Sequence, residues 1–226
     1  MAVAEDLEGR SSLAIRSLSA VVMLLLISLV LWLGGFWFDI FVAIIAIICL
    51  KEFITIGILG FRDLWPRVAV ISMGIIYLSL ATYAIVSLPN SVFTSLLVIV
   101  VATDVGAYFS GRTFGGPKIA PNISPSKTWA GLVGGFIAAG LISTNIFFWF
   151  NSGSSSIIMT TIAFGVGGVL AIVAQAGDFF ESWLKRRAGV KDSSNLIPGH
   201  GGVFDRVDGL LPVAIIGSAL WSIHPS

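Results

Sequence analysis

Residues 17–56 read SLSAVVMLLLISLVLWLGGFWFDIFVAIIAIICLKEFITI, and the charged side chains in this stretch are Asp39, Lys51 and Glu52. A helix that spans a membrane needs about 20 mostly apolar residues, so the stretch is long enough for two helices, which we place at 17–35 and 36–56. The apolar run of the first is too long for a secretory signal peptide, and no small-residue cleavage site follows it. The stretch therefore predicts two consecutive membrane-spanning helices.

The same criterion predicts five more spans in the rest of the chain, at 66–88, 91–111, 128–150, 156–184 and 208–223. Of the 226 residues, 56% are hydrophobic and 11% are charged, whereas a soluble domain carries about 25% charged residues. This composition excludes an ordinary soluble enzyme, a disordered protein and a nucleic-acid-binding protein with a basic face. We predict an all-α, multi-pass membrane bundle of about seven helices, with a polar tail over 1–16 and one transmembrane domain over 17–226.

The positive charges predict how this bundle is oriented. If the N-terminus is placed in the cytoplasm, all 13 lysines and arginines fall on the cytoplasmic side, in the tail and in or next to the connections after the second, fourth and sixth spans, with Lys51 slightly within the second helix. Lysine and arginine are enriched in cytoplasmic loops of membrane proteins. The C-terminus is then expected on the outer side. The single cysteine, Cys49, lies in an apolar run and is predicted to be buried and unpaired.

The connection after the fourth span begins with an ionisable residue inside an apolar stretch. Asp104 shares a helical face with Tyr108 and Gly111, and Arg112 follows directly. An ionisable side chain within a span is costly and indicates a function by default. The alternative is a carboxylate that pairs with a neighbouring lysine for packing alone.

The segment Ser124-Pro125-Ser126-Lys127-Thr128 has the features of a helix start, with a Ser or Thr cap and an early proline. The free N–H groups and the dipole of a helix N-terminus favour an anion, and Lys127 adds a full positive charge. The segment predicts a phosphate site. The alternative, equally supported by this segment, is a lysine that anchors a helix at the lipid headgroups.

The connection after the sixth span carries the densest set of polar residues. On a helix, Asp178, Glu181, Ser182 and Lys185 project from one side; for Glu181 alone we favour a surface pair with Lys185. After His200, two glycines, Gly201 and Gly202, allow backbone N–H groups to approach a ligand closely.

Two carboxylates and a guanidinium, in Asp205, Arg206 and Asp208, then precede the last span. Asp208 is either the N-cap of that span or part of a site. Spans five and seven begin at the cytoplasmic face and spans four and six end there, so phosphate-binding helix ends would neighbour carboxylates suited to a hard cation. This arrangement predicts a metal-assisted phosphoryl or nucleotidyl transfer site.

These residues resemble the phosphatidate cytidylyltransferase (CDP-diacylglycerol synthase) family. Its signature, S-x-[apolar]-K-R-x4-K-D-x-[small]-x2-[apolar]-P-x-H-G-G-[apolar]-x-D-R-[apolar]-D, fits residues 182–208 at every fixed position. The upstream elements T-D-x-x-A-Y-x-x-G-R and S-P-x-K-T-W also fit, at 103–112 and 124–129, although Ala130 replaces an acidic or amide residue often found there. The resemblance covers roughly residues 100–225.

The resemblance implies the reaction CTP + phosphatidate → CDP-diacylglycerol + diphosphate, in phospholipid biosynthesis. By resemblance, Asp178 and Asp205 hold the catalytic Mg²⁺, with a second, monovalent cation such as K⁺. The residues expected to act in catalysis are Asp178, Asp205, Lys127, Lys191 and Arg206. Those expected to bind substrates are Asp104, Arg112, Ser124, Lys185, Arg186, His200, Gly201, Gly202 and Asp208.

The implied partners are CTP from the cytosol and phosphatidic acid from the bilayer, with no nucleic acid; a homodimer is left open. The implied location is the inner (plasma) membrane, with the active site facing the cytoplasm. Two alternatives remain at this point: a CTP-dependent lipid or polyprenol kinase, and a non-catalytic lipid-headgroup-binding membrane protein or transporter.

Overall fold

The computed structural model describes residues 2–151 and 156–223. The side chains of 2–12, which belong to the predicted tail, lie outside that description. Six helices are long and apolar enough to cross a membrane, and they match the first six predicted spans. They are α1 (Ala2–Leu33), α2 (Gly35–Gly60), α3 (Leu64–Ser87), α4 (Asn90–Phe114), α5 (Trp129–Phe150) and α6 (Ile157–Arg187). The predicted all-α membrane bundle is confirmed.

The seventh predicted span is shorter than the other six. Over 208–223 the chain forms a helix, α8 (Leu210–Ile223), of 14 residues, preceded by a single turn, α7 (Phe204–Val207). At about 1.5 Å per residue α8 is about 21 Å long, whereas the hydrocarbon core of a bilayer is about 30 Å thick. By length the described residues therefore contain six spans and a shorter apolar helix. The predicted polar tail is also helical, because α1 begins at Ala2.

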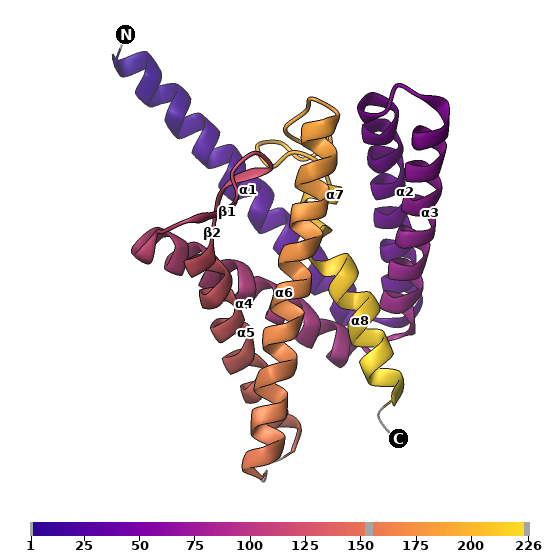
Figure 1. The fold of residues 1–226 in the computed structure, drawn as a ribbon, viewed down its shortest axis with the longest axis vertical. Helices are drawn as coiled ribbons and strands as arrows, with labels where there is room; N and C mark the ends of the chain where they lie inside the picture. Colours follow the sequence, from indigo (N-terminus) through magenta and orange to yellow (C-terminus); the bar gives the residue numbers. More distant parts are fainter. Residues whose placement is uncertain (1, 152–155, 224–226) are drawn as a thin grey trace.

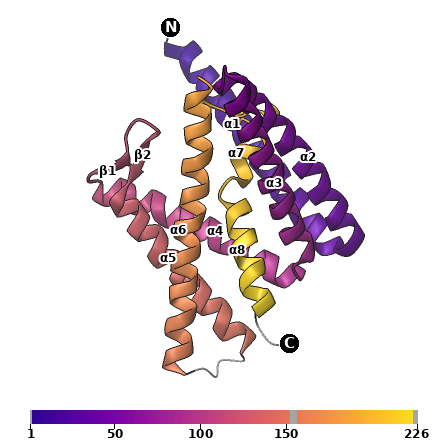
Figure 2. The same cartoon turned by 45° about the vertical axis from the view of Figure 1, so that its right-hand side comes forward.

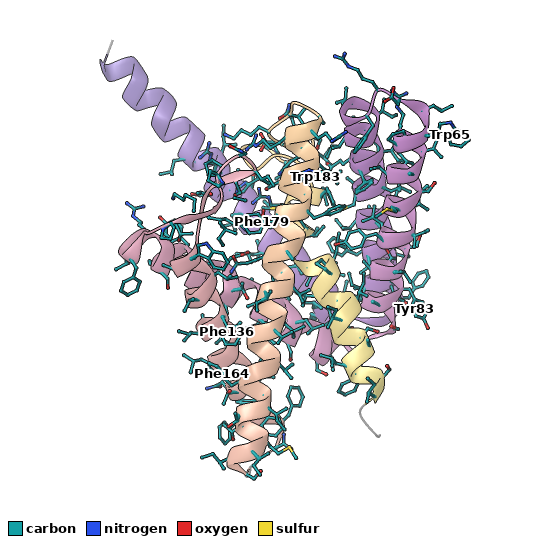
Figure 3. The ribbon with its side chains drawn as sticks, viewed as in Figure 1. Trp65, Tyr83, Phe136, Phe164, Phe179 and Trp183 are labelled. Carbon is teal, nitrogen blue, oxygen red and sulfur yellow. The ribbon has the colours of Figure 1, made fainter. Side chains whose placement is uncertain are left out.

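The helices form one bundle around α6 (Figures 1 and 2). On one side of α6, α5 packs between α6 and the oblique α4; on the other side lie α2, α3 and α8. Aromatic rings join neighbouring helices, as with Phe136 of α5 and Phe164 of α6, whose ring centroids are 5.9 Å apart in an edge-to-face arrangement (Figure 3). The core consists of buried side chains such as Phe53, Leu184 and Phe204 from α2, α6 and α7.

Large apolar side chains cover the outside of the bundle. Trp65 and Tyr83 of α3 are 82% and 73% exposed and point away from the other helices (Figure 3). A soluble protein rarely exposes so continuous an apolar surface, whereas lipid tails are a suitable solvent for it. Cys49 is buried and unpaired, as predicted.

A short antiparallel hairpin was not predicted. It is formed by β1 (Lys118–Ala120) and β2 (Ser124–Thr128), with Lys118 opposite Thr128. The predicted helix start at 124–128 is therefore wrong for Pro125, which lies in a strand, and right for the cap: Thr128 Oγ1 accepts from Gly131 N at 3.0 Å. The physical reason is that a residue before proline avoids the helical region, and an edge strand tolerates proline.

The polar connections gather toward one half of the molecule. The upper half of Figure 1 contains the start of α1, the ends of α2 and α6, and the hairpin. The lower half contains the end of α5, the start of α6 and the end of α8. The view in Figure 2 agrees. The two segments that carry the predicted site residues therefore lie in the same half of the bundle.

Candidate active site

The C-terminal half of α6 forms the centre of the candidate site. Lys127 reaches it from β2 and forms an ion pair with Asp178. The Lys127 ammonium also lies 4.8 Å from the centroid of the Phe179 ring, on the side of α6 that faces the hairpin (Figure 3). Ser182 Oγ donates to Asp178 Oδ1 at 3.3 Å. The hairpin thus brings Lys127 to a carboxylate 51 positions away in the sequence.

One helical turn further along α6, a lysine bridges two carboxylates. Lys185 Nζ lies 2.6 Å from Glu181 Oε2 and 2.7 Å from Asp205 Oδ1. Glu181 is 1% exposed. The predicted pairing of Glu181 with Lys185 is correct, but its predicted place on the surface is wrong, because the segment containing Asp205 packs over this face of α6.

Asp205 is held by backbone as well as by side chains. The N–H groups of Ser193 and Gly202 donate to Asp205 Oδ2 at 2.9 and 2.8 Å. Burial alone would raise the pKa of the Asp205 carboxyl. The hydrogen bonds that it shares with Glu181 and Lys185, and those from the two N–H groups, outweigh burial and hold the pKa well below its usual value.

Three carboxylates converge beside this network. Asp178, Glu181 and Asp208, which we call the acidic cluster, each offer an oxygen within 4.8 Å of the others. Burial, and then the negative charge of Asp178, raise the pKa of Asp208 to about 7. A hard cation would relieve this concentration of negative charge, so the acidic cluster could hold a metal ion. The predicted metal pair overlaps it in Asp178, while the oxygens of Asp205 are turned to Lys185 and to N–H groups.

The candidate site contains two neighbouring cavities that share Asp104. The first, of about 480 Å³, lies between α4, the hairpin, α5 and α6, and its polar lining includes Asp104, Tyr108, Arg112, Lys118, Lys127 and Gln175. The second, of about 330 Å³, is lined almost wholly by charged residues: Asp104, Asp178, Glu181, Lys185, Asp192, Asp205, Arg206 and Asp208. Each cavity joins elements that are far apart in the sequence.

Eight of the predicted site residues line these cavities, and the others do not. The eight are Asp104, Arg112, Lys127, Asp178, Lys185, Asp205, Arg206 and Asp208. Outside the cavity linings are Ser124, Arg186, Lys191, His200, Gly201 and Gly202. Asp208 lines the second cavity. Its Oδ1 accepts from the N–H of Gly209, the residue directly before α8, at 2.8 Å.

Some of the outlying residues have a visible structural role. Arg186 Nε donates to the carbonyl of Ile123 at 3.3 Å, which ties α6 to the hairpin. Gly202 is packed so closely that a Cβ there would lie 1.9 Å from Ser193 Oγ. His200 Nδ1 is buried and has no hydrogen-bond partner within the described part of the chain.

Sequence reasoning missed Glu52, a residue of α2 that contacts the same segment as Asp205. Glu52 accepts hydrogen bonds from Ser193, Ser194, Val203 and Phe204. The signal that marked Asp104, an ionisable residue within an apolar span, was present at Glu52 as well. The role of Glu52 depends on partners at the other end of the chain, which are tertiary contacts that the sequence alone does not show.

Comparisons with known proteins agree with the resemblance. A family model described as "Cytidylyltransferase family" matches residues 66–224. A phosphatidate cytidylyltransferase of Rickettsia bellii is 33% identical over 218 residues, which cover 92% of this chain and 90% of that protein. One of Pseudomonas aeruginosa is 34% identical over 174 residues, covering 74% and 61%.

A phosphatidate cytidylyltransferase of Brucella suis is 43% identical over 129 residues, which cover 54% of this chain. The match spans 43% of the Brucella protein, so less than half of its length is represented. The matched family model covers the hairpin, the acidic cluster and both cavities. This chain is therefore a member of the cytidylyltransferase family.

Proposed function

We propose that this protein transfers CMP from CTP to phosphatidic acid and releases diphosphate, which makes it a phosphatidate cytidylyltransferase. The observation that carries the proposal is the convergence of Lys127, Lys185 and the acidic cluster at the polar half of a membrane bundle. The names of the similar proteins from Rickettsia, Pseudomonas and Brucella support it.

In the proposed reaction, a phosphate oxygen of phosphatidic acid attacks the α-phosphorus of CTP. The bond from that phosphorus to the bridging oxygen breaks, and its electron pair leaves with diphosphate. The second pKa of a phosphate monoester is about 6, so the nucleophile is mostly ionised at neutral pH and needs no general base. The residues must instead position the reactants and compensate their negative charge.

Lys127 is well placed for this task, since it lies between the two cavities beside Asp178. In the first cavity Arg112 and Lys118 add positive charge, and in the second Lys185 and Arg206 do. We assign these side chains to the phosphates of CTP and the lipid. Lys191 is exposed and lines neither cavity, although the next residue, Asp192, lines the second one. Its contact with a phosphate stays a prediction.

A divalent cation belongs to the proposal. Asp178, which is common to the predicted metal pair and to the acidic cluster, would hold Mg²⁺ together with carboxylates of the second cavity, Asp205 or Asp208. A bound Mg²⁺ supplies charge compensation for attacking and leaving oxygens. A second, monovalent cation such as K⁺ and a homodimer also remain proposals.

The lipid substrate accounts for the membrane setting. Phosphatidic acid can reach the polar half of the bundle by moving within the leaflet, while CTP arrives from water. We place this half at the cytoplasmic face, on the ground that lysines and arginines favour that side. The bacterial relatives suggest the inner membrane as the location.

The test uses the full chain, purified in detergent, with phosphatidic acid and CTP labelled in either the α- or the γ-phosphate. The proposal expects the α-label in a CDP-lipid and the γ-label in diphosphate. A γ-label in lipid would identify a kinase instead. The absence of both products, with folded protein, would point to a lipid-binding protein without catalysis.

A further inference from the structure

A carboxylate from the second helix is buried against the segment that forms the active site. Glu52 lies in α2 and is 5% exposed. Its partners lie more than 140 positions away, between Ser193 and Phe204. Among the described residues, none that lines either of the two site cavities belongs to α2. Any effect of Glu52 on the reactants must therefore pass through the segment that it binds.

Both oxygens of Glu52 are fully used as acceptors. Oε1 accepts from Ser194 Oγ at 2.5 Å and from Val203 N at 3.1 Å. Oε2 accepts from Ser193 Oγ at 3.0 Å and from Phe204 N at 2.7 Å. Hydrogen bonds to a charged acceptor are stronger than neutral ones, and in a site of low water content an unmade one is costly. The four donors thus hold the segment firmly to α2.

Two further donors of the same segment bind Asp205. Ser193 donates its backbone N–H to Asp205 and its hydroxyl to Glu52. At the other end, Gly202 N donates to Asp205, and the next two N–H groups donate to Glu52. Two carboxylates from different elements therefore hold both ends of 193–204 in one conformation.

We propose that Glu52 is a positioning residue of the active site. By fixing Val203 and Phe204, it sets the direction in which the following residues, Asp205 to Asp208, face the second cavity. This inference rests on the proposed function, because its effect on activity is measured as CDP-lipid synthesis. Its effect on structure is measured separately, as hydrogen exchange of 193–204.

The main test is Glu52→Gln, which keeps the size of the side chain. One acceptor oxygen becomes an NH₂ donor that faces two donors, so two of the four hydrogen bonds are lost. We expect the specific activity of the folded protein to fall by at least about tenfold through kcat. Backbone amides of 193–204 should exchange hydrogen for deuterium faster in the absence of substrates.

Asp39→Asn is the matched control. Asp39 lies on the same helix, is exposed, and undergoes the same change from carboxylate to amide. We expect its activity to stay within about twofold of wild type, a range that corresponds to a negligible change in barrier. The exchange of 193–204 should not change in this variant.

A second variant covers the case in which Glu52→Gln does not fold. Ser194→Ala removes the hydroxyl that donates to Glu52 Oε1, from a half-buried side chain, and with it the acceptor of the exposed Leu196 N–H. We expect a smaller loss of activity, about threefold or more, with a matching increase in exchange at 193–204 and an unchanged melting temperature.

Two results would overturn the inference. One is a folded Glu52→Gln protein whose specific activity is within twofold of wild type. The other is a variant whose yield and melting temperature fall while the specific activity of the folded fraction does not, which would make Glu52 a stability residue. If Glu52→Gln does not fold, normal activity in Ser194→Ala overturns it as well. A wild-type protein without CDP-lipid synthesis would contradict the proposed function instead, and the exchange data would still decide on Glu52.

Discussion

Lys127 contacts two groups at once, the Asp178 carboxylate and the Phe179 ring. Substitution Lys127→Met keeps much of the apolar stem and removes the charge. Losing a charge-assisted contact costs about 1.5–3 kcal/mol, so we expect turnover to fall roughly ten- to a hundredfold, with membrane insertion unchanged. The measurement is CDP-lipid synthesis by purified protein.

Lys51→Met serves as the control, because Lys51 is exposed, lies on α2 and lines neither cavity. It should retain wild-type turnover. If Lys127→Met also stays within twofold of wild type, Lys127 is an anchor for the hairpin and not a phosphate ligand.

Asp178 is the carboxylate that the predicted metal pair and the acidic cluster have in common. Asp178→Asn removes one charge and preserves the shape of the side chain. We expect at least a hundredfold loss of activity, about 2.7 kcal/mol, and a higher Mg²⁺ concentration for half-maximal rate. Excess Mg²⁺ should restore the rate in part.

Asp192→Asn is the internal comparison for this prediction. Asp192 lines the second cavity but does not belong to the acidic cluster, so we expect a smaller loss. Running Asp205→Asn and Asp208→Asn beside it decides which of the two shares the cation with Asp178. Near-normal, Mg²⁺-dependent synthesis by Asp178→Asn would remove the metal assignment while leaving the family unaffected.

Individual residues were predictable where the motif and the helix period agree. Asp178 and Lys185 share a helical face by spacing alone, and the structure places them in one cavity. Glu181 was assigned to the surface because its burial depends on the segment around Asp205, which arrives 24 positions later. Glu52 was missed for the same reason: its partners all come from the other end of the chain.

At the scale of elements, α4 and α5 approach each other through glycines. A Cβ on Gly134 would lie 1.8 Å from Ser110 Oγ and 2.8 Å from the carbonyl of Gly106. Small residues allow such close packing of helices in membranes. Gly134→Val should therefore push the helices apart and destabilise the protein by about 1–3 kcal/mol, measured as a lower melting temperature in detergent.

Gly165→Val is the matched control for this prediction, since a Cβ on Gly165, in α6, would meet nothing within 4 Å. The two variants share the same change in helix propensity. Equal melting temperatures for both would mean that the contact between α4 and α5 relaxes without cost.

The elements themselves were predictable to different degrees. The first six helices follow from the length of apolar runs, which is a local property of the sequence. The hairpin could not be predicted in this way, because Ser124 to Thr128 contains both cap and turn residues. Its conformation is fixed by pairing with Lys118 and by the bond from Arg186 to Ile123, which are tertiary contacts.

At the scale of the whole molecule, the polar connections lie in one half of the bundle (Figure 1). Reporter insertions can test whether this half faces the cytoplasm. A reporter inserted after Ser87 should face the outer side, and reporters after Pro121 and Asn195 should face the cytoplasm, because the lysines and arginines lie with the latter two. A cytoplasmic signal after Ser87 would reverse the scheme.

Because α8 is short, the side of the membrane on which it ends decides whether the bundle has six or seven spans. α8 ends in the half opposite to the start of α1 (Figure 1), although its 14 residues cover about 21 Å. A bilayer can thin around a short segment at a modest cost, and α8 packs against α3, α4 and α6. We therefore expect a reporter placed after Ile223 to face the outer side. A cytoplasmic signal there, together with an outer signal after Ser87, would mean that α8 enters the membrane without crossing it and that the bundle has six spans.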